Sequence, residues 1–464
     1  MAASFVTSSL HLGHIATAML PLCNNELTER CYHFGLTFVM KHPLKMKRIL
    51  FSLAALMCLI GATAADPTST RYSGSECEGS GMPYPAVQTT AYPDSLTPVM
   101  INHVGRHGAR FPSSARFTVA LLRSLNRADS LGTITSTGRQ LISLCNTVIN
   151  MAKGRWGALD TLGMAEQRAI ASRMYAAYPG VFKNARIEAI SSYAPRCIMS
   201  MDEFTHQISR LNNRVEIYTS SGRQNSPLVR FFDLNTDYKE FMAGEAWHET
   251  YERFVDTTCP VTAIDRALGK NYPYEPGEQQ DMALNEYKLI SGCAAMSLDV
   301  DWEKFFTIEE YNALWACSNM HHYLTHSAST LSTVPADMAY PLLQNLIETT
   351  DLFIMDQGAQ PSVRLRFGHA ETLMPLLSLM HIPGCYYMTN YFDTVGLHWR
   401  DFYIVPMGAN LQMILFKSKS GNYYVRVDLN ETPVPLIPGR TTIYTPWAAA
   451  REYLNRCIPL IYQE

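Results

Sequence analysis

The stretch Asn102-His103-Val104-Gly105-Arg106-His107-Gly108-Ala109-Arg110-Phe111-Pro112 directly follows the apolar run Pro98-Val99-Met100-Ile101. The apolar run predicts a buried strand, and the strand delivers a histidine between two arginines. A guanidinium group pairs with phosphate through two parallel charge-assisted hydrogen bonds, and a neutral imidazole is a nucleophile. Gly108 lets the backbone approach a neighbour closely, and Pro112 fits the entry to a following helix. The stretch therefore favours an anion site with a built-in nucleophile over its alternative, a basic surface turn.

A second motif, Gly368-His369-Ala370-Glu371, follows a predicted strand in which Val363, Leu365 and Phe367 alternate with Arg364 and Arg366. A helix is predicted from Thr372 to His381. Active sites of open α/β sheets form at the carboxyl ends of strands, so both motifs fit one site. His369 can bind a phosphate oxygen, and a phosphate dianion pushes a nearby carboxyl such as Glu371 towards its protonated form. Taken alone, His369 could be structural and Glu371 a helix cap, but beside the first motif they favour chemistry.

Periodicity predicts an α/β fold with a large, mostly helical insertion. A helix is expected after Ser113 or Ser114, with Phe117, Leu121 and Leu125 on its apolar face. Further helices are expected from Asp160 or Thr161 to Pro179, and over 199–211, 247–268, 281–296, 308–322, 341–354 and 447–456. Strands are expected over 186–192 and, as a hairpin, over 410–416 and 423–429. We assign residues 66–130 and 356–464 to the α/β domain and 131–355 to the insertion, which also carries a strand and Arg196 near the site.

The N-terminal region has the pattern of an export signal. Lys45, Lys47 and Arg48 precede the uncharged apolar run 49–65, which ends in Ala62-Thr63-Ala64-Ala65. This is typical of a signal peptide over residues 46–65 with a small-residue cleavage site, and a signal anchor is the alternative. We therefore expect Met46 to be the true start, residues 1–45 to be a non-native extension, and the product to be secreted or periplasmic with no stable membrane span after cleavage.

The bulk composition is that of a globular protein. The 464 residues are 47% hydrophobic and 17% charged, with a formal net charge of −3. No Lys/Arg-rich tract is present, so nothing indicates nucleic-acid binding. Of the eleven cysteines, the eight that follow residue 65 allow disulfides in an exported protein, with no pairing readable from the sequence. No cysteine or histidine spacing indicates a zinc site, and we expect no metal or other cofactor.

The Arg-His-Gly-x-Arg-x-Pro motif at residues 106–112 resembles the signature of the histidine acid phosphatases. Most members of that family carry His-Asp at the second motif. His369-Ala370-Glu371 is instead similar to the branch of multiple inositol polyphosphate phosphatases, as is the run from Arg366 to Met380. The resemblance covers about residues 99–380 and includes Arg196 and a helix-start element with Gly163 and Glu166. Phe111 stands where many members have Tyr.

This resemblance implies a phosphoglycerate-mutase-like α/β domain with a helical cap, and hydrolysis of phytate and lower inositol polyphosphates without a metal. It implies that His107 forms a phosphohistidine and that Glu371 donates the proton to the leaving group. The same resemblance gives phosphate binding to Arg106, Arg110, Arg196 and His369. A broad acid or sugar phosphatase is the first alternative. Phosphoglycerate mutase and a non-catalytic phosphate-binding protein are more distant ones.

Several weaker signals favour structural roles. The triplet His321, His322 and His326 could suggest a metal but lacks a carboxylate motif, so a helix surface or end is favoured. His103 is expected to lie in the strand with a supporting role at most. Arg364 and Arg366 could reach substrate phosphates, although exposed strand arginines are common.

Overall fold

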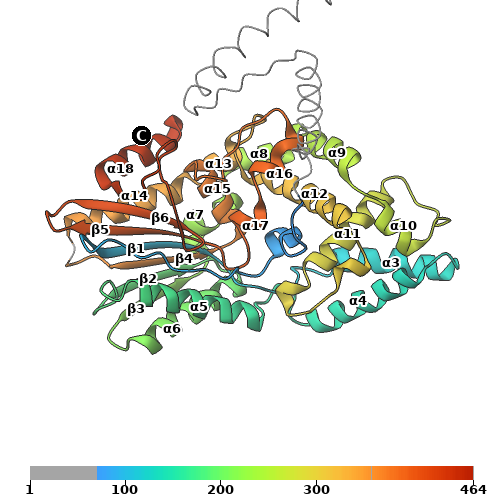
Figure 1. The fold of residues 1–464 in the computed structure, drawn as a ribbon, viewed down its shortest axis with the longest axis horizontal. Helices are drawn as coiled ribbons and strands as arrows, with labels where there is room; N and C mark the ends of the chain where they lie inside the picture. The colour runs from blue at the N-terminus through green and yellow to red at the C-terminus, as the bar shows by residue number, and fades with distance from the viewer. Residues whose placement is uncertain (1–70, 357, 463–464) are drawn as a thin grey trace, which may run out of the picture. The chain divides into compact units, whose positions relative to one another are not determined.

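The computed structural model describes residues 71–356 and 358–462 (Figure 1). The predicted signal peptide and the upstream extension lie outside this range and stay predictions. Among the helices of the described chain, none combines the length and apolar character needed to cross a membrane. The eight cysteines of this range form no disulfide with one another.

One mixed sheet organises the α/β part of the chain. Its strand order is β3-β2-β4-β1-β5-β6-β7, and β8 pairs with β6. The strands are β1 (Leu96–Arg106), β2 (Arg186–Ser191), β3 (Glu216–Ser221), β4 (Val363–Gly368), β5 (Asn410–Ser418), β6 (Tyr423–Leu429), β7 (Thr432–Val434) and β8 (Thr445–Pro446). The first four are parallel, whereas β5 runs antiparallel to β1 and forms the predicted hairpin with β6. The β1 strand is longer than its apolar run because it continues through the first half of the motif to Arg106.

Helices account for most of the remaining chain. They are α3 (Arg116–Ser130), α4 (Ser136–Ala152), α5 (Thr161–Ala177), α6 (Pro195–Leu211), α7 (Ser226–Val229), α8 (Thr236–Ala243), α9 (Ala246–Thr258), α10 (Thr262–Leu268), α11 (Glu278–Ser291), α12 (Ile308–His326), α13 (Val334–Asp337), α14 (Tyr340–Met355), α15 (Ala370–Leu379), α16 (Val395–His398), α17 (Asp401–Ile404) and α18 (Trp447–Cys457). A short 3₁₀ segment, η2 (Glu76–Gly81), interrupts the irregular lead-in. The predicted helix 247–268 is two helices, broken at Cys259-Pro260-Val261, since proline lacks the amide proton that a helix needs.

Alternation along β1 explains why helices cover both faces of the sheet. Met100 and Val104 face one core, whereas Ile101 faces the other. Figure 1 shows α5 and α6 on one side of the sheet and α14, α15 and α18 on the other. The parallel strands are therefore buried on both faces, as parallel sheets require.

A third core joins α3, α4, α10, α11 and the first half of α12 beyond the strand ends (Figure 1). Leu121 and Leu125 are buried in it as predicted. The prediction that Phe117 lies on the apolar face of this helix is wrong, because its side chain is 41% exposed. The predicted caps at Ser113 and Ser114 are also wrong, because the N-cap of α3 is Ala115.

The division at residues 130 and 356 does not follow this packing. The β2 and β3 strands and the α5 and α6 helices come from within 131–355 but belong to the sheet layer. Conversely, α3 was assigned to the α/β domain and packs with the helical group. Helices from two separate segments of the chain therefore stand over the carboxyl ends of the parallel strands.

Candidate active site

Three parallel strands deliver the core of the site to one edge of the sheet. His107 follows β1, His369 follows β4 and Ser192 follows β2. The His107 amide donates to the Gly368 carbonyl at 3.1 Å, and the Ser192 amide donates to the Phe367 carbonyl at 3.0 Å. The imidazole rings of His107 and His369 are 5.7 Å apart between centroids. The strand ladder thus brings together two motifs that are far apart in the sequence.

His107 is prepared for nucleophilic attack. Its Nδ1 lies 2.9 Å from the Gly108 carbonyl oxygen, which can only accept, so Nδ1 carries the proton and Nε2 carries the lone pair. Burial lowers the pKa of His107 well below its ordinary value, and Arg106, Arg110 and Arg196 lower it further. The ring is therefore neutral over the whole physiological range.

The three predicted arginines form an anion pocket around His107. Arg106, Arg110 and Arg196 each have a buried Nε atom without a hydrogen-bond partner in the described chain. Burial, together with repulsion from the neighbouring arginines, lowers the pKa of Arg106 to about 10 and that of Arg110 to about 9. Native proteins leave few buried donors unsatisfied, so three such donors, on arginines whose charges all act on His107, indicate a place for an anionic ligand. The pocket fits a phosphoryl group.

His369 lies between two arginines, one of which the sequence did not reveal. Arg196 Nη2 is 3.2 Å from His369 Nδ1, and Arg230 Nη1 is 2.8 Å from Nε2. Burial and these arginines lower the pKa of His369 to about 3, so the ring is neutral and one of its nitrogens carries a proton. Only one arginine can then donate to the ring, which leaves donors of the other free for an anion. Arg230 is therefore a fourth arginine among the candidate phosphate ligands.

Glu371 lies in the first turn of α15, as predicted. Beside a bound phosphate its carboxyl is expected to be protonated, but without phosphate its neighbours favour the ionised form. Burial raises the pKa of Glu371, but His369, His326, Arg106 and a backbone amide outweigh burial and hold it at about 2. In the free protein Glu371 is therefore a carboxylate.

The loop between His107 and Pro112 is fixed by side chains of α5 and α6. Glu166 accepts hydrogen bonds from the amides of Ala109 at 2.7 Å and Tyr84 at 2.8 Å. Ser200 Oγ accepts from the Gly108 amide at 3.1 Å. The predicted helix-start element around Glu166 thus holds the motif in shape.

Three of the weaker candidates, Arg364, Arg366 and His103, are held by other contacts. Arg366 is buried and donates to Asn102 and Asn345, and Arg364 pairs with Glu188, so the contacts of these two arginines are with other residues of the protein. His103 is buried between Phe204 and Phe367. In the described residues, no group of three or more His, Cys, Asp or Glu side chains is arranged to hold a metal ion.

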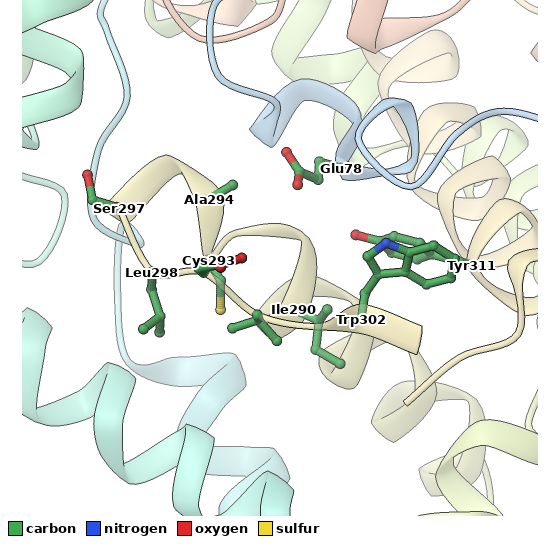
Figure 2. Close-up of a pocket in the computed structure, with 10 residues that line it drawn as sticks. Glu78, Ile290, Cys293, Ala294, Ser297, Leu298, Trp302 and Tyr311 are labelled. Atoms are coloured by element: carbon green, nitrogen blue, oxygen red, sulfur yellow. The ribbon is translucent and has the colours of Figure 1, made fainter. Parts of the chain in front are cut away.

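A cleft of about 1000 Å³, its open mouth included, leads from solvent to Arg106 and Arg110. Its lining also includes Lys288 of α11 and Ser318 and His322 of α12. Figure 2 shows a neighbouring cavity, which is lined by Glu78, Trp302 and Tyr311 among others. Glu78 also lines the cleft, and burial raises its pKa to about 7, so at mildly acidic pH it is neutral beside an anion. The larger cleft, and not its neighbour, reaches the arginines.

Comparison with known families agrees with this geometry. The profile of the histidine phosphatase superfamily (branch 2) matches residues 99–430, which is most of the chain. The chain belongs to this family. The multiple inositol polyphosphate phosphatase 1 of Homo sapiens is 24% identical in an alignment of 388 residues that covers 75% of this chain and 77% of the human protein. The protein of the same name from Gallus gallus is 22% identical in an alignment of 396 residues that covers 78% of this chain and 82% of the relative.

Solved structures support the fold of this histidine phosphatase. The multiple inositol polyphosphate phosphatase of Bifidobacterium longum in complex with inositol hexasulfate superimposes with a TM-score of 0.70 at 17% identity, covering 84% of this chain and 98% of that one. The phytase from D. castellii gives a TM-score of 0.65 at 15% identity, with 86% and 89% covered. The predicted phosphoglycerate-mutase-like α/β fold with a helical cap is confirmed.

Proposed function

We propose that this histidine phosphatase hydrolyses phosphate monoesters of inositol, from phytate to lower inositol polyphosphates, through a phosphohistidine. The observation that carries the proposal is that a neutral His107 lies among Arg106, Arg110 and Arg196, whose charges lower its pKa and whose buried Nε donors have no partner in the described chain. The inositol substrate class is supported by the names of the human and chicken relatives and by the Ala370 spacer of the second motif.

The geometry accommodates a reaction in two steps, transfer of the phosphoryl group to His107 and hydrolysis of the phosphohistidine. First, the lone pair of His107 Nε2 forms a bond to phosphorus, the bond from phosphorus to the ester oxygen breaks, and Glu371 donates its proton to the leaving alkoxide. Second, water attacks the phosphohistidine while Glu371 takes up one of its protons, and the nitrogen–phosphorus bond breaks to release phosphate. The arginines stabilise the charge on the equatorial oxygens in both steps. Because free Glu371 is ionised, a substrate phosphate that arrives as the monoanion supplies the proton, which favours mildly acidic pH.

The test is phosphate release from phytate by the full chain, compared with His107→Ala. Release must vanish in the variant, while binding of phytate, followed by calorimetry, persists because the arginines remain. Denaturing the parent enzyme during turnover of labelled phytate must trap an acid-labile, base-stable label on His107. Substantial turnover by His107→Ala contradicts the mechanism. A preference for simple sugar phosphates over phytate would instead favour the broader phosphatase.

We also propose that the enzyme is exported. The basic residues before the apolar run 49–65, and the small residues that end it, support a cleaved signal peptide. Expression of the full gene should give an extracytoplasmic product whose N-terminus lies near Ala65 or Asp66. A product that keeps residues 1–45 contradicts this proposal.

A further inference from the structure

His322, on α12, lines the same cleft as Arg106. A substrate with several phosphates places only one of them in the arginine pocket. Its other phosphates must then lie along the cleft, where the side chains of α11 and α12 meet them. His322 takes no part in the two proposed chemical steps, so its position in the cleft is available for another role.

A fully buried carboxylate orients the His322 ring. His322 Nδ1 is 2.9 Å from Asp401 Oδ2, and Asp401 has no exposed side-chain surface, whereas the His322 side chain is 24% exposed. Asp401 also accepts from Trp315 Nε1 at 2.9 Å and from the Ser80 amide at 3.1 Å. Because a carboxylate only accepts, Nδ1 donates to it, and Nε2 is the nitrogen left for a ligand. A histidine held in this way is preorganised for binding.

The same network fixes the distance between His322 and the arginine pocket. The Ser80 amide donates to Asp401, and the Ser80 carbonyl accepts from Arg106 Nη1 at 2.6 Å. Ser80 of η2 therefore connects Asp401, which orients His322, to Arg106, a predicted ligand of the transferred phosphate. Rigid spacing of this kind lets a site recognise two groups on one rigid ring.

Lys288, on the neighbouring helix α11, adds a positive charge to the lining of the cleft. Its ammonium group lies 4.2 Å from the centroid of the Phe117 ring, and both side chains line the cleft. The exposed Phe117 ring therefore lies against a cation in the cleft. Such a cation attracts an anionic substituent of the substrate.

We propose that His322 and Lys288 form a second phosphate subsite, which binds a phosphate that is not being transferred and selects cyclitols with two or more phosphates. The inference rests on the phosphatase function proposed above. It adds to that function a discrimination between polyphosphates and monophosphates.

Steady-state kinetics with phytate and p-nitrophenyl phosphate test the subsite. The ratio of kcat/KM for phytate to that for p-nitrophenyl phosphate should fall at least tenfold in His322→Ala and in Lys288→Ala, and further in the double variant. His322→Gln, whose amide can still donate to Asp401, separates loss of the ligand atom from loss of the buried contact. His248→Ala is the matched control, since His248 is an exposed histidine paired with Glu252 on α9. An unchanged ratio, whether both substrates suffer equally or neither suffers, overturns the subsite.

A binding measurement separates the subsite from turnover. In the His107→Ala background, calorimetric titration with phytate should show at least a tenfold weaker Kd when His322 and Lys288 are both replaced by alanine. If the parent enzyme hydrolyses neither substrate but this weakening is seen, the proposed function fails and the subsite stands. If the parent hydrolyses phytate and the Kd does not change, the function stands and the subsite fails.

Discussion

Gly108 and Gly163 contact each other backbone to backbone. A Cβ atom on Gly108 would lie 2.4 Å from the Gly163 carbonyl oxygen, and one on Gly163 would lie 2.2 Å from the Ala109 carbonyl oxygen. These contacts dock the catalytic loop on the first turn of α5. The absence of both side chains lets Glu166 reach the Ala109 amide.

We therefore expect Gly163→Ala to displace the loop. The steric conflict involves backbone on both sides, so it should lower the free energy of unfolding by about 1–3 kcal/mol. Because the loop carries His107, kcat should fall about 100-fold even though Gly163 touches no substrate. Urea unfolding and phosphate-release kinetics measure the two effects. Gly180→Ala is the control, since a Cβ at Gly180 meets nothing within 4 Å; equal behaviour of the two variants would contradict the close-packing argument.

Glu371→Gln should slow turnover according to the leaving group. Glutamine keeps the shape but cannot deliver a proton, so release from alkyl phosphates such as phytate should fall by about 10²–10⁴-fold. An aryl leaving group such as p-nitrophenolate needs little protonation and should suffer much less in the first step. Single-turnover rates with the two substrates measure the difference. An equal loss with both would instead indicate that Glu371 acts mainly by its charge.

The sequence was sufficient for residues whose role depends on local position. His107, Arg106 and Arg110 lie within a few residues of a strand end, and the same holds for His369 and Glu371, so one apolar strand followed by a motif locates each group. Arg230 could not be found in this way. It follows the short helix α7, in a segment without a motif, and its role depends entirely on the tertiary contact with His369.

For Arg364 and Arg366 of β4, the local sequence pattern suggests the wrong environment. Alternation of Arg364 and Arg366 with apolar residues suggests an exposed face, but β4 is a central strand between β1 and β2. Arg366 is consequently buried, and its charge is solvated by the amide oxygens of Asn102 and Asn345. Partners from β1 and α14 decided that outcome, and no local pattern contains them.

Arg230→Ala should weaken the phosphate site although the motif is intact. The loss of a charged donor beside His369 should reduce kcat/KM by about 10–100-fold, since hydrogen bonds to charged groups contribute about 1.5–3 kcal/mol. Arg223→Ala is a matched control, because Arg223 and Arg230 both stack on the Tyr193 ring, at 4.5 and 4.8 Å, and only Arg230 contacts His369. Similar kinetics for the two variants would show that the stacking on Tyr193, and not the contact with His369, is what matters.

Glu286 should make the stability of the helical group depend on pH. Its side chain on α11 is fully buried, and neither carboxyl oxygen has a hydrogen-bond partner within the described chain. Burial raises the pKa of Glu286 to about 8 from an ordinary value of 4.5, and the nearby Arg266 offsets only part of this. Between these two pH values the folded chain binds a proton that the unfolded chain has released. The free energy of unfolding should therefore fall as the pH rises from about 4.5 to about 8, by at most about 1.4 kcal/mol per pH unit from this one group.

Glu286→Gln removes the titration while keeping the size of the side chain, so the variant should lose this part of the pH dependence. It should be more stable than the parent near pH 8, where the parent must bury a carboxylate, and closer to it near pH 5. Urea unfolding at several pH values measures the slope. Asp281→Asn, which neutralises an exposed acid on the same helix, should leave the slope as it is in the parent. If Glu286→Gln also leaves it unchanged, the carboxyl is solvated at neutral pH, and the core around α11 must open to water.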